Sequence, residues 1–226
     1  PAGLGSNDIG LDRGLLGGGR IVKFTKIGKK VMLVEPNYSY RAISPSERER
    51  IAVEQSFAQS TIWGFTAEAE TGNVVLVDAT DFLTRDAMQA ANRIRRMQQG
   101  AYTIDKTRSA LYLPTCKNFP LNTEMEASVT FVNADGSAGS YVQAVAPSTE
   151  AITLRMHHSF VQLPDDNYKP RKFDPRSSFN NTSYYNYSSS VSLPIEEYVI
   201  NRHRLEKKDP SAAISEPVKP IVYYLD

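Results

Sequence analysis

A strict alternation of apolar and polar residues between Met125 and Phe131 is the strongest constraint that this sequence places on its fold. Apolar residues stand at positions 125, 127, 129 and 131, with Glu126, Ser128 and Thr130 between them. Successive side chains of a strand point to opposite faces, so this stretch predicts a strand with one buried and one solvated face. One-sided strands of this kind are typical of antiparallel sheets. A second apolar face is predicted within residues 151–163, at Ile152, Leu154, Met156, His158 and Phe160.

Two β-hairpins are predicted upstream of this strand. Arg20–Thr25 and Lys30–Glu35 are separated by a short turn that contains a glycine, and Thr61–Ala69 and Asn73–Ala79 are separated by a Thr-Gly turn. The return strand of the second hairpin, Val74–Val77, is apolar at every position. A strand of this composition is expected at the centre of a sheet, with both faces covered.

The first predicted helix begins at Ser44-Pro45-Ser46-Glu47. This sequence has the capping-box pattern, with proline at the first helical position. We expect the helix to run to about residue 58, with Ile51, Val53 and Phe57 facing inward.

A second helix is predicted within Phe82–Gln99, because Gly100 supplies a stop signal. It carries Arg93, Arg95 and Arg96, which could contact an acidic partner. Helical spacing distributes these three residues around the helix, so a solvated face is the favoured interpretation.

Short strands and turns are predicted for most of the remaining chain. Strands are expected around Ala101–Ile104 and Ser109–Leu113, and a turn at Asn133–Gly136 leads into a further strand at Ser140–Ala146. From Pro164 onward, prolines and a stretch rich in Ser, Asn and Tyr predict an extended segment that wraps a surface instead of building a core. The predicted fold class is therefore α+β: mainly antiparallel β-sheet built from hairpins, with two helices and a long irregular C-terminal extension.

Composition removes several classes of function. The 226 residues are 41% hydrophobic and 23% charged, which are ordinary globular values. The formal net charge of +1 favours neither nucleic acid nor a membrane surface. No apolar run approaches the roughly 20 residues that span a bilayer. We therefore expect no nucleic-acid partner and no membrane span.

The sequence predicts no metal ion or cofactor in this chain. His157 and His158 are neighbours on a predicted strand, so their side chains point to opposite faces and do not suit one ion. His158 is interpreted as a hydrogen-bonded core residue, and His157 as a surface or interface residue that could contact a ligand. The glycine-rich stretch Gly3–Gly19 precedes a strand instead of following one, so it does not fit a dinucleotide or P-loop fingerprint.

No catalytic residue is predicted either. Cys116 could block the zinc of a partner domain, as the thiolate of matrix-metalloprotease propeptides does, but the flanking Arg and Gly of such motifs are missing and an inert thiol is favoured. Asp78 and Asp81 could divide acid and base roles, but anchoring a turn and capping a helix are simpler roles for them. Asn133–Gly136 faintly resembles a calcium loop without its distal glutamate. No serine stands in a nucleophile-elbow pattern.

Three tyrosines, Tyr184, Tyr185 and Tyr187, form the most distinctive candidate contact surface. Tyrosine offers a large contact area at low entropic cost, so these rings could stack on a sugar or a peptide. They could equally cover a neighbouring domain.

Short motifs in a fixed order along nearly the whole chain carry a family resemblance. Those in the first half are Gly10–Gly14, Arg20–Phe24, Ser56–Ala58, Trp63–Phe65, Val77–Leu83 and Arg108–Ala110. Those in the second half are Phe119–Glu124, His157–Phe160, Phe173–Arg176, Arg202–Pro210, Ser215–Pro217 and Pro220–Asp226. Together they resemble an uncharacterised N-terminal domain that precedes the metzincin-like catalytic domain in a family of bacterial zinc-dependent metalloproteases.

The resemblance implies a role without chemistry of its own. The family's zinc motif, HExxHxxGxxH, is absent from this sequence and is expected further along the polypeptide. The chain would then be an accessory or scaffold domain of an exported protease (periplasmic, attached to the outer membrane or secreted) that packs on the catalytic domain and supports or regulates it. The alternative is an independent glycan- or peptide-binding module that uses the tyrosine-rich segment.

The resemblance also implies where the two domains meet. We expect the accessory domain to occupy residues 1–215, and residues 216–226 to form a linker and the first strand of the catalytic domain, at Ile221–Leu225. Interdomain contacts are expected at Arg202, His203, Arg204, Lys207, Lys208, Tyr223 and Tyr224.

Overall fold

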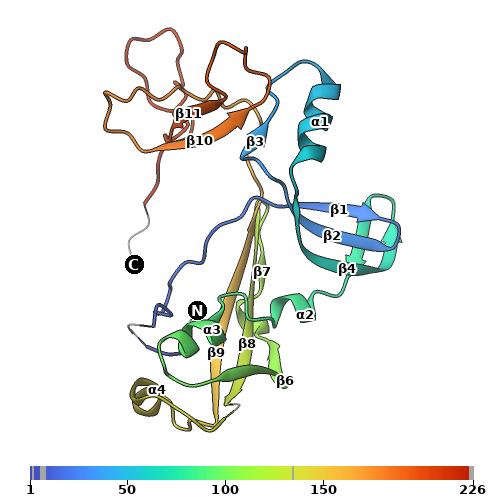
Figure 1. Ribbon diagram of the computed structural model, residues 1–226, viewed down its shortest axis with the longest axis vertical. Coiled ribbons are helices and arrows are strands. Elements are labelled where there is room, and N and C mark those ends of the chain that lie inside the picture. Colours follow the sequence, from blue (N-terminus) through green and yellow to red (C-terminus); the bar gives the residue numbers. More distant parts are fainter. Residues whose placement is uncertain (2, 6–8, 134, 224–226) are drawn as a thin grey trace. The chain divides into compact units, whose positions relative to one another are not determined.

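The chain forms two compact units, shown in the computed structural model of Figure 1. The structure describes residues 1, 3–5, 9–133 and 135–223. The first unit comprises Pro1–Pro36 and Ser60–Leu163, and the second comprises Asn37–Gln59 and Pro164–Asp226. The predicted α+β class is confirmed, although the described residues contain four α-helices instead of two. None of the described helices is long and apolar enough to cross a membrane.

The first sheet of the first unit contains the two predicted hairpins. Its strands are β1 (Lys23–Ile27), β2 (Lys30–Glu35), β4 (Ser60–Thr71) and β5 (Val74–Val77), all antiparallel and in the order β1-β2-β4-β5. The predicted central position of Val74–Val77 is wrong, because β5 lies at the edge of the sheet. An apolar run of this length does not reveal from sequence whether both of its faces are covered.

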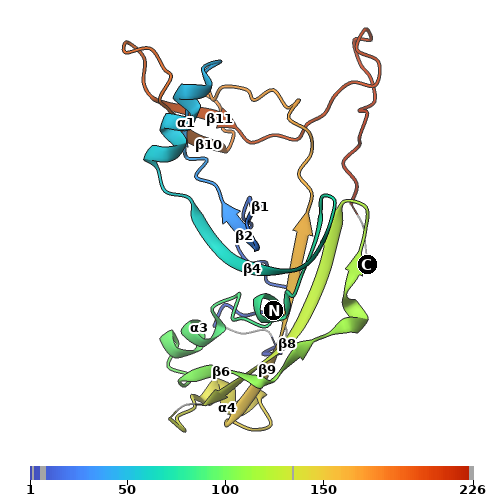
Figure 2. The ribbon, with the colours of Figure 1, turned by 90° about the vertical axis from the view of Figure 1, so that its right-hand side faces the viewer.

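The second sheet is built around a long central strand. β8 (Asn122–Asn133) pairs with β6 (Tyr102–Leu111), with β7 (Lys117–Asn118) and with β9 (Ala151–Val161), always antiparallel. Figure 2 shows β8 and β9 side by side. The predicted alternation is confirmed in β8, where the side chains of Ala127, Val129 and Phe131 are completely buried.

β6 replaces two shorter predicted strands. Its pairing with β8 shifts between Asp105 and Ala110. There the Asp105 carboxylate accepts hydrogen bonds from Thr107 and Arg108, which together lower the pKa of Asp105 to about 2. The predicted gap between the two strands therefore corresponds to an irregularity within a single strand.

A hydrophobic core covers one face of this second sheet. Two helices pack there, α3 (Ala90–Arg96) and α4 (Ser140–Val145), and both lie close to β8 and β9 in Figure 2. The buried residues of this core are Leu4, Ile9, Leu11, Ala90, Ile94, Tyr102, Ala127, Val129, Phe131, Val142, Ile152, Leu154 and Met156.

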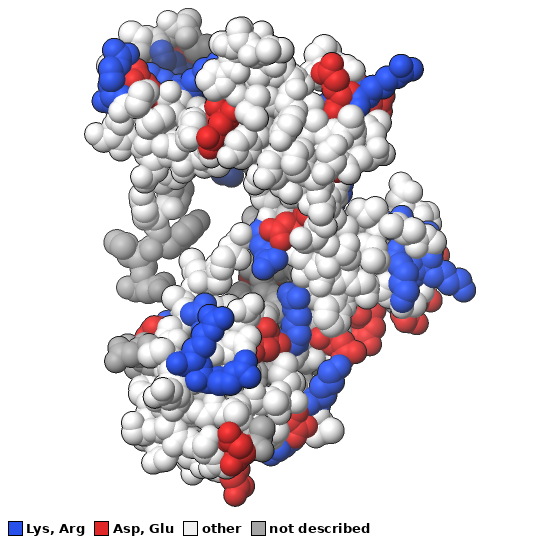
Figure 3. Space-filling model, viewed as in Figure 1, with Lys and Arg blue, Asp and Glu red and all other residues white. Residues whose placement is uncertain are grey.

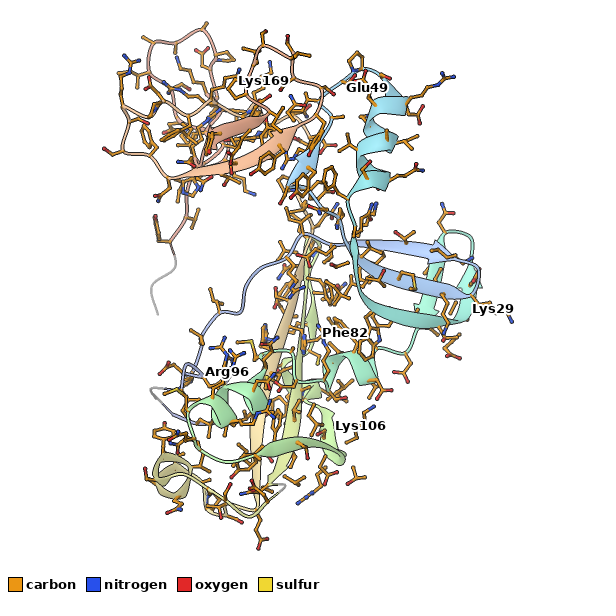
Figure 4. The ribbon with its side chains drawn as sticks, in the orientation of Figure 1. Lys29, Glu49, Phe82, Arg96, Lys106 and Lys169 are labelled. Atoms are coloured by element: carbon orange, nitrogen blue, oxygen red, sulfur yellow. The ribbon has the colours of Figure 1, made fainter. Side chains whose placement is uncertain are left out.

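A second core joins the two sheets of this unit. Its buried residues are Val31, Leu33 and Phe65 from the first sheet, and Phe82 and Leu83 from the short helix α2 (Thr80–Leu83). Met125 and Phe160, at the ends of β8 and β9, pack against it. Figure 4 labels Phe82, whose ring meets both sheets.

The predicted helix within Phe82–Gln99 is divided into α2 and α3. Asp86 separates them, because its carboxylate oxygens accept hydrogen bonds from the backbone N–H groups of Ala90 and Ala91, at 2.6 and 3.0 Å. A side chain that satisfies the free N–H groups of a first turn starts a new helix at that point.

The predicted strand at Ser140–Ala146 is wrong, since these residues form α4. The Oε1 atom of Gln99 accepts hydrogen bonds from the N–H groups of Tyr141 and Val142, at 3.0 and 3.3 Å. This cap comes from a residue far away in the sequence, so no local capping signal precedes the helix.

The second unit is assembled from two segments that are distant in sequence. Its sheet has the order β11-β10-β3, with β11 (Glu196–Ile200) antiparallel to β10 (Asn181–Asn186), and β10 parallel to β3 (Tyr40–Arg41). Tyr184 is 6% exposed. The prediction that the stretch rich in Ser, Asn and Tyr after Pro164 builds no core is therefore wrong for β10.

The helix of the second unit, α1 (Glu47–Ser56), begins slightly later than predicted. Its N-cap is Ser46, whose hydroxyl accepts a hydrogen bond from the N–H of Glu49. None of its residues is buried, so the predicted inward orientation of Ile51 is wrong. Phe57 follows the helix and stacks on Tyr40 at 3.8 Å between ring centroids.

His158 is a hydrogen-bonded core residue, as predicted. Its Nε2 atom lies 3.0 Å from the carbonyl oxygen of Leu83, which can only accept, so Nε2 carries the proton. Burial lowers the pKa of His158 despite this hydrogen bond, and the positive charge of Arg85 adds to the lowering.

We predict that the first unit loses stability as the pH falls below about 6.5, the ordinary pKa of histidine. The unfolded chain takes up a proton there, whereas the folded chain does so only at lower pH. The contribution of His158 to stability is therefore fully present above pH 6.5. It is lost as the pH falls towards the pKa that His158 has in the folded chain. Replacing His158 with Gln should remove this dependence of the free energy of unfolding on pH.

Urea unfolding followed by the fluorescence of Trp63 measures this effect, because the chain has one tryptophan and it packs against the second core. The exposed His203, changed to Gln, is the matched control. The assignment would be contradicted if the free energy of unfolding had the same pH dependence between pH 6.5 and 5 in the parent chain and in the His158→Gln variant.

Candidate functional site

β10 sorts the tyrosine-rich segment onto two faces of the second unit's sheet. Tyr184 and Asn186 are buried, whereas Tyr185 is half-buried and Tyr187 is exposed. Because side chains alternate along a strand, the first two share one face and the other two share the opposite face. One face carries a polar network and the other an aromatic stack.

The polar network centres on the carboxylate of Glu197. It accepts hydrogen bonds from Asn186 Nδ2 at 2.7 Å, from the Tyr184 hydroxyl at 3.0 Å and from the Ser189 hydroxyl at 3.4 Å. The hydrogen bond from Asn186 lowers the pKa of Glu197 against the opposing effect of burial, and that from Tyr184 adds to the lowering. Burial raises the pKa of Tyr184, and the contact with Glu197 raises it further. Glu197 is thus held as a carboxylate by neutral donors.

Asn186 also joins the two sequence segments of this unit. Its Oδ1 atom accepts hydrogen bonds from the N–H groups of Ile43 and Ser188, both at 3.1 Å. One buried amide therefore connects residues 37–59, β10 and Glu197. Glu49 of α1, labelled in Figure 4, accepts a further hydrogen bond from the Ser188 hydroxyl.

The aromatic stack lies on the other face of the sheet. Tyr40 is nearly parallel to Phe57 and also stacks on Tyr185, at 5.4 Å between centroids. Phe57 contacts Tyr187 at 5.2 Å. All three tyrosines predicted as ligand contacts are thus engaged in packing, although Tyr187 is 48% exposed.

A pocket of about 520 Å³ opens beside this sheet. Its apolar wall includes Phe173, Leu193, Pro194 and Tyr198, and Glu197 lies among its lining residues. Such a pocket suits an apolar group with a hydrogen-bond donor or a positive charge directed at the carboxylate. None of the three predicted tyrosines lines it.

His157 belongs to a polar cluster on the solvent face of β8 and β9. Its Nε2 atom lies 2.7 Å from Glu124, while Arg155 pairs with Glu126 at 2.9 Å. Burial would raise the pKa of Glu124, but hydrogen bonds from Asn122, Ser159 and His157 together lower it. The described residues contain no group of three or more His, Cys, Asp or Glu side chains placed to hold a metal ion.

The other candidate residues have structural partners. The Cys116 sulfur lies 3.5 Å from the carbonyl oxygen of Tyr112. Asp78 accepts a hydrogen bond from the N–H of Thr80, and Asp81 pairs with Lys106, which Figure 4 labels.

The predicted turn at Asn133–Gly136 is held by side chains, although Ala134 lies outside the described residues. Asn133 Oδ1 accepts hydrogen bonds from the N–H groups of Asp135 and Gly136. Asp135 in turn accepts from Ser137. The carboxylate is thereby occupied within the turn.

The arginines of α3 have mixed environments. Arg93 donates hydrogen bonds to the carbonyl oxygens of Gly10 and Met88, whereas Arg95 and Arg96 are exposed. Their positive charges form a blue patch over α3 in Figure 3, but positive and negative side chains are interspersed over that view as a whole. The arrangement agrees with a solvated face.

The residues predicted for interdomain contact lie in the C-terminal segment, and several interact locally. Arg204 pairs with Asp165 at 2.6 Å and with Glu206 at 2.9 Å. Arg202 donates to the carbonyl oxygen of Lys169, a residue labelled in Figure 4, and Lys207 donates to that of Ala212.

The remaining predicted contacts are exposed or undescribed. His203, Lys208 and Tyr223 are exposed, and Tyr224 lies outside the described residues. Residues 221–223 form no strand, and the rest of the strand predicted at Ile221–Leu225 is not described. The boundary at residues 215 and 216 stays a prediction.

Large apolar side chains of the same segment are open to solvent. Ile214 is 93% exposed and Tyr223 is 84% exposed. Leu205, Val218, Ile221 and Val222 are exposed as well.

Sequence reasoning missed the residues that organise this unit. Asn186 and Glu197 carry no motif, and their partners are separated from them by turns or by a whole domain segment. Only the period-two placement of Tyr184 and Asn186 hinted that both face inward.

A family model described as a domain of unknown function (DUF5117) matches residues 14–208. No curated protein and no solved structure matches the chain. The match includes most of both units, among them the pocket and the polar network around Glu197, and ends before residues 209–226.

We predict that replacing Asn186 with Asp destabilises the second unit at pH 7 by about 2 kcal/mol or more, because it removes a donor and places a second carboxylate beside Glu197. Because the two carboxylates repel each other, the pKa of one of them is raised in the folded state. The loss should therefore be complete at neutral pH and be relieved as the pH falls below that raised pKa.

Amide hydrogen exchange of β10 and β11 measures this loss without interference from the first unit. Asn180→Asp makes the same change of charge at an exposed position and should have little effect. A variant at Asn186 that matches this control at every pH would show that the network does not hold the unit together.

Proposed function

The chain belongs to the DUF5117 family, and from this premise we propose that it is a non-catalytic accessory domain of an exported bacterial zinc-dependent metalloprotease. It packs on the catalytic domain of the same polypeptide and supports or regulates it. The ordered motifs that resemble the N-terminal domain of such proteases support the proposal. In this scheme the zinc-binding motif belongs to the downstream domain.

The observation that carries the proposal is the apolar exposure of residues 205–223. Ile214 and Tyr223 are almost fully open to solvent, which leaves large apolar areas in water. Burying such side chains in an interface is worth roughly 25 cal/mol per Å² before the costs of association. The C-terminal segment therefore gains free energy by packing on another protein surface.

The charged residues of the segment fit a structural role at this junction. Arg204 is held between Asp165 and Glu206, and the side chain of Lys207 is bound to a local backbone carbonyl. These contacts fix the course of the segment. Of the residues predicted for interdomain contact, the exposed His203 and Lys208 then remain available to the catalytic domain.

The polar clusters of the described residues also support the proposal of a scaffold role. They are composed of satisfied hydrogen bonds and ion pairs, such as that of Glu197 with Asn186 and Tyr184. Arrangements of this kind stabilise a scaffold. Binding, positioning and protection of the catalytic domain are the functions that such a scaffold supplies.

In the parent protease, we predict that combining Ile214→Asp with Tyr223→Asp lowers peptide hydrolysis about tenfold. A loss of about 1.4 kcal/mol of interdomain packing lowers the ratio of packed to unpacked molecules by this factor, and interface hot-spot residues contribute that much or more. Hydrolysis of a short fluorogenic peptide measures activity. The midpoint temperature of heat inactivation measures how far the accessory domain stabilises the catalytic domain.

Leu16→Asp is the matched control, because Leu16 is equally exposed but lies in the first unit. A protease that lacks residues 1–215 should be less soluble or less active. If the double variant and the truncated protease both cleaved and inactivated like the parent, the proposal would fail.

A further inference from the structure

β5 presents an open edge of the first sheet. Among the described residues it pairs with β4 alone, so the backbone groups on its other side have no strand partner. Val74 is 71% exposed and Leu76 is 64% exposed. An apolar edge of this kind is a template for another strand.

The opposite edge of the same sheet is built differently. β1 carries Lys23 and Lys26, and lysines are a common device that prevents edge pairing. β5 consists of Val-Val-Leu-Val, without charge, proline or glycine. One edge is thus protected, and the other is left able to pair.

A pocket of about 530 Å³ lies beside this open edge. Val75 and Val77 of β5 line it, together with Phe24 of β1 and Val31 of β2, two strands that are not adjacent to β5 in the sheet. Side chains of an added strand alternate between the two faces of the sheet, so every second one would project on the face that bears this pocket. The pocket selects apolar side chains at alternate positions.

Two exposed acidic residues lie close to the edge. Glu68 stands at the irregularity in β4 opposite β5 and is exposed, and Asp78 directly follows β5. Lys26, the basic residue of the pocket, is already paired with Glu70 at 2.7 Å. A segment that docks here gains from carrying Lys or Arg.

We propose that β5 binds an extended peptide as a fifth strand, and that the peptide has apolar residues at alternate positions flanked by a basic residue. Backbone hydrogen bonds provide the affinity, and the pocket and acidic rim provide the selectivity. This inference concerns the first unit and does not depend on packing through residues 205–223.

The probe is the acetylated, amidated peptide Lys-Val-Thr-Val-Thr-Val, titrated into the isotope-labelled chain. It should bind with a submillimolar Kd and slow amide exchange in β5. Two changes should each weaken binding at least tenfold: N-methylation of alternate peptide amides, and the edge-protecting variant Leu76→Lys. Ile27→Lys adds the same charge to an exposed position of β1 and should leave binding unchanged.

Three results would overturn the proposal. The first is no binding of the probe by a chain whose amide spectrum shows it to be folded. The second is binding that survives both N-methylation and Leu76→Lys, which would place the peptide elsewhere. The third is concentration-dependent self-association that Leu76→Lys abolishes, which would make a second copy of the chain the occupant.

Discussion

The antiparallel pairing of β8 with β9 is the constraint on which the first unit depends. It runs without interruption from Asn122↔Val161 to Val132↔Ala151. The inward side chains of both strands include several that are completely buried, among them Phe131. Slipping the register by one residue would exchange the two faces and bring charged residues into the core, so the pairing is strongly specified.

The same pair of strands serves both cores and a polar surface. One end packs under α3 and α4, while Met125 and Phe160 at the other end reach the core beneath the first sheet. The outward face carries the ion pair of Arg155 with Glu126. Two strands thus unite the helices, both sheets and a solvated face in one unit.

Periodicity and turn chemistry predicted much of this fold from sequence. The alternation in β8 and β9 and the two hairpins needed only local information. The features that sequence did not reveal depend on distant partners: Gln99 caps α4 from outside the helix, and Asn186 bonds to Ile43 in another segment. Such contacts leave no local signal, and for the same reason the edge position of β5 could not be deduced.

The second unit shows how little of a candidate site a local pattern reveals. The three neighbouring tyrosines suggested one contact surface, but strand alternation divides them between a polar network and an aromatic stack. The prediction of a C-terminal contact segment depended on a family resemblance, and it stays a prediction.

Amide hydrogen exchange, compared between this chain alone and the parent protease, tests the central claim most directly. If residues 205–223 pack on the catalytic domain, their amides should exchange at least about tenfold more slowly in the parent protease, which corresponds to about 1.4 kcal/mol of added protection. Equal exchange rates in the two proteins would contradict the proposed role of this segment.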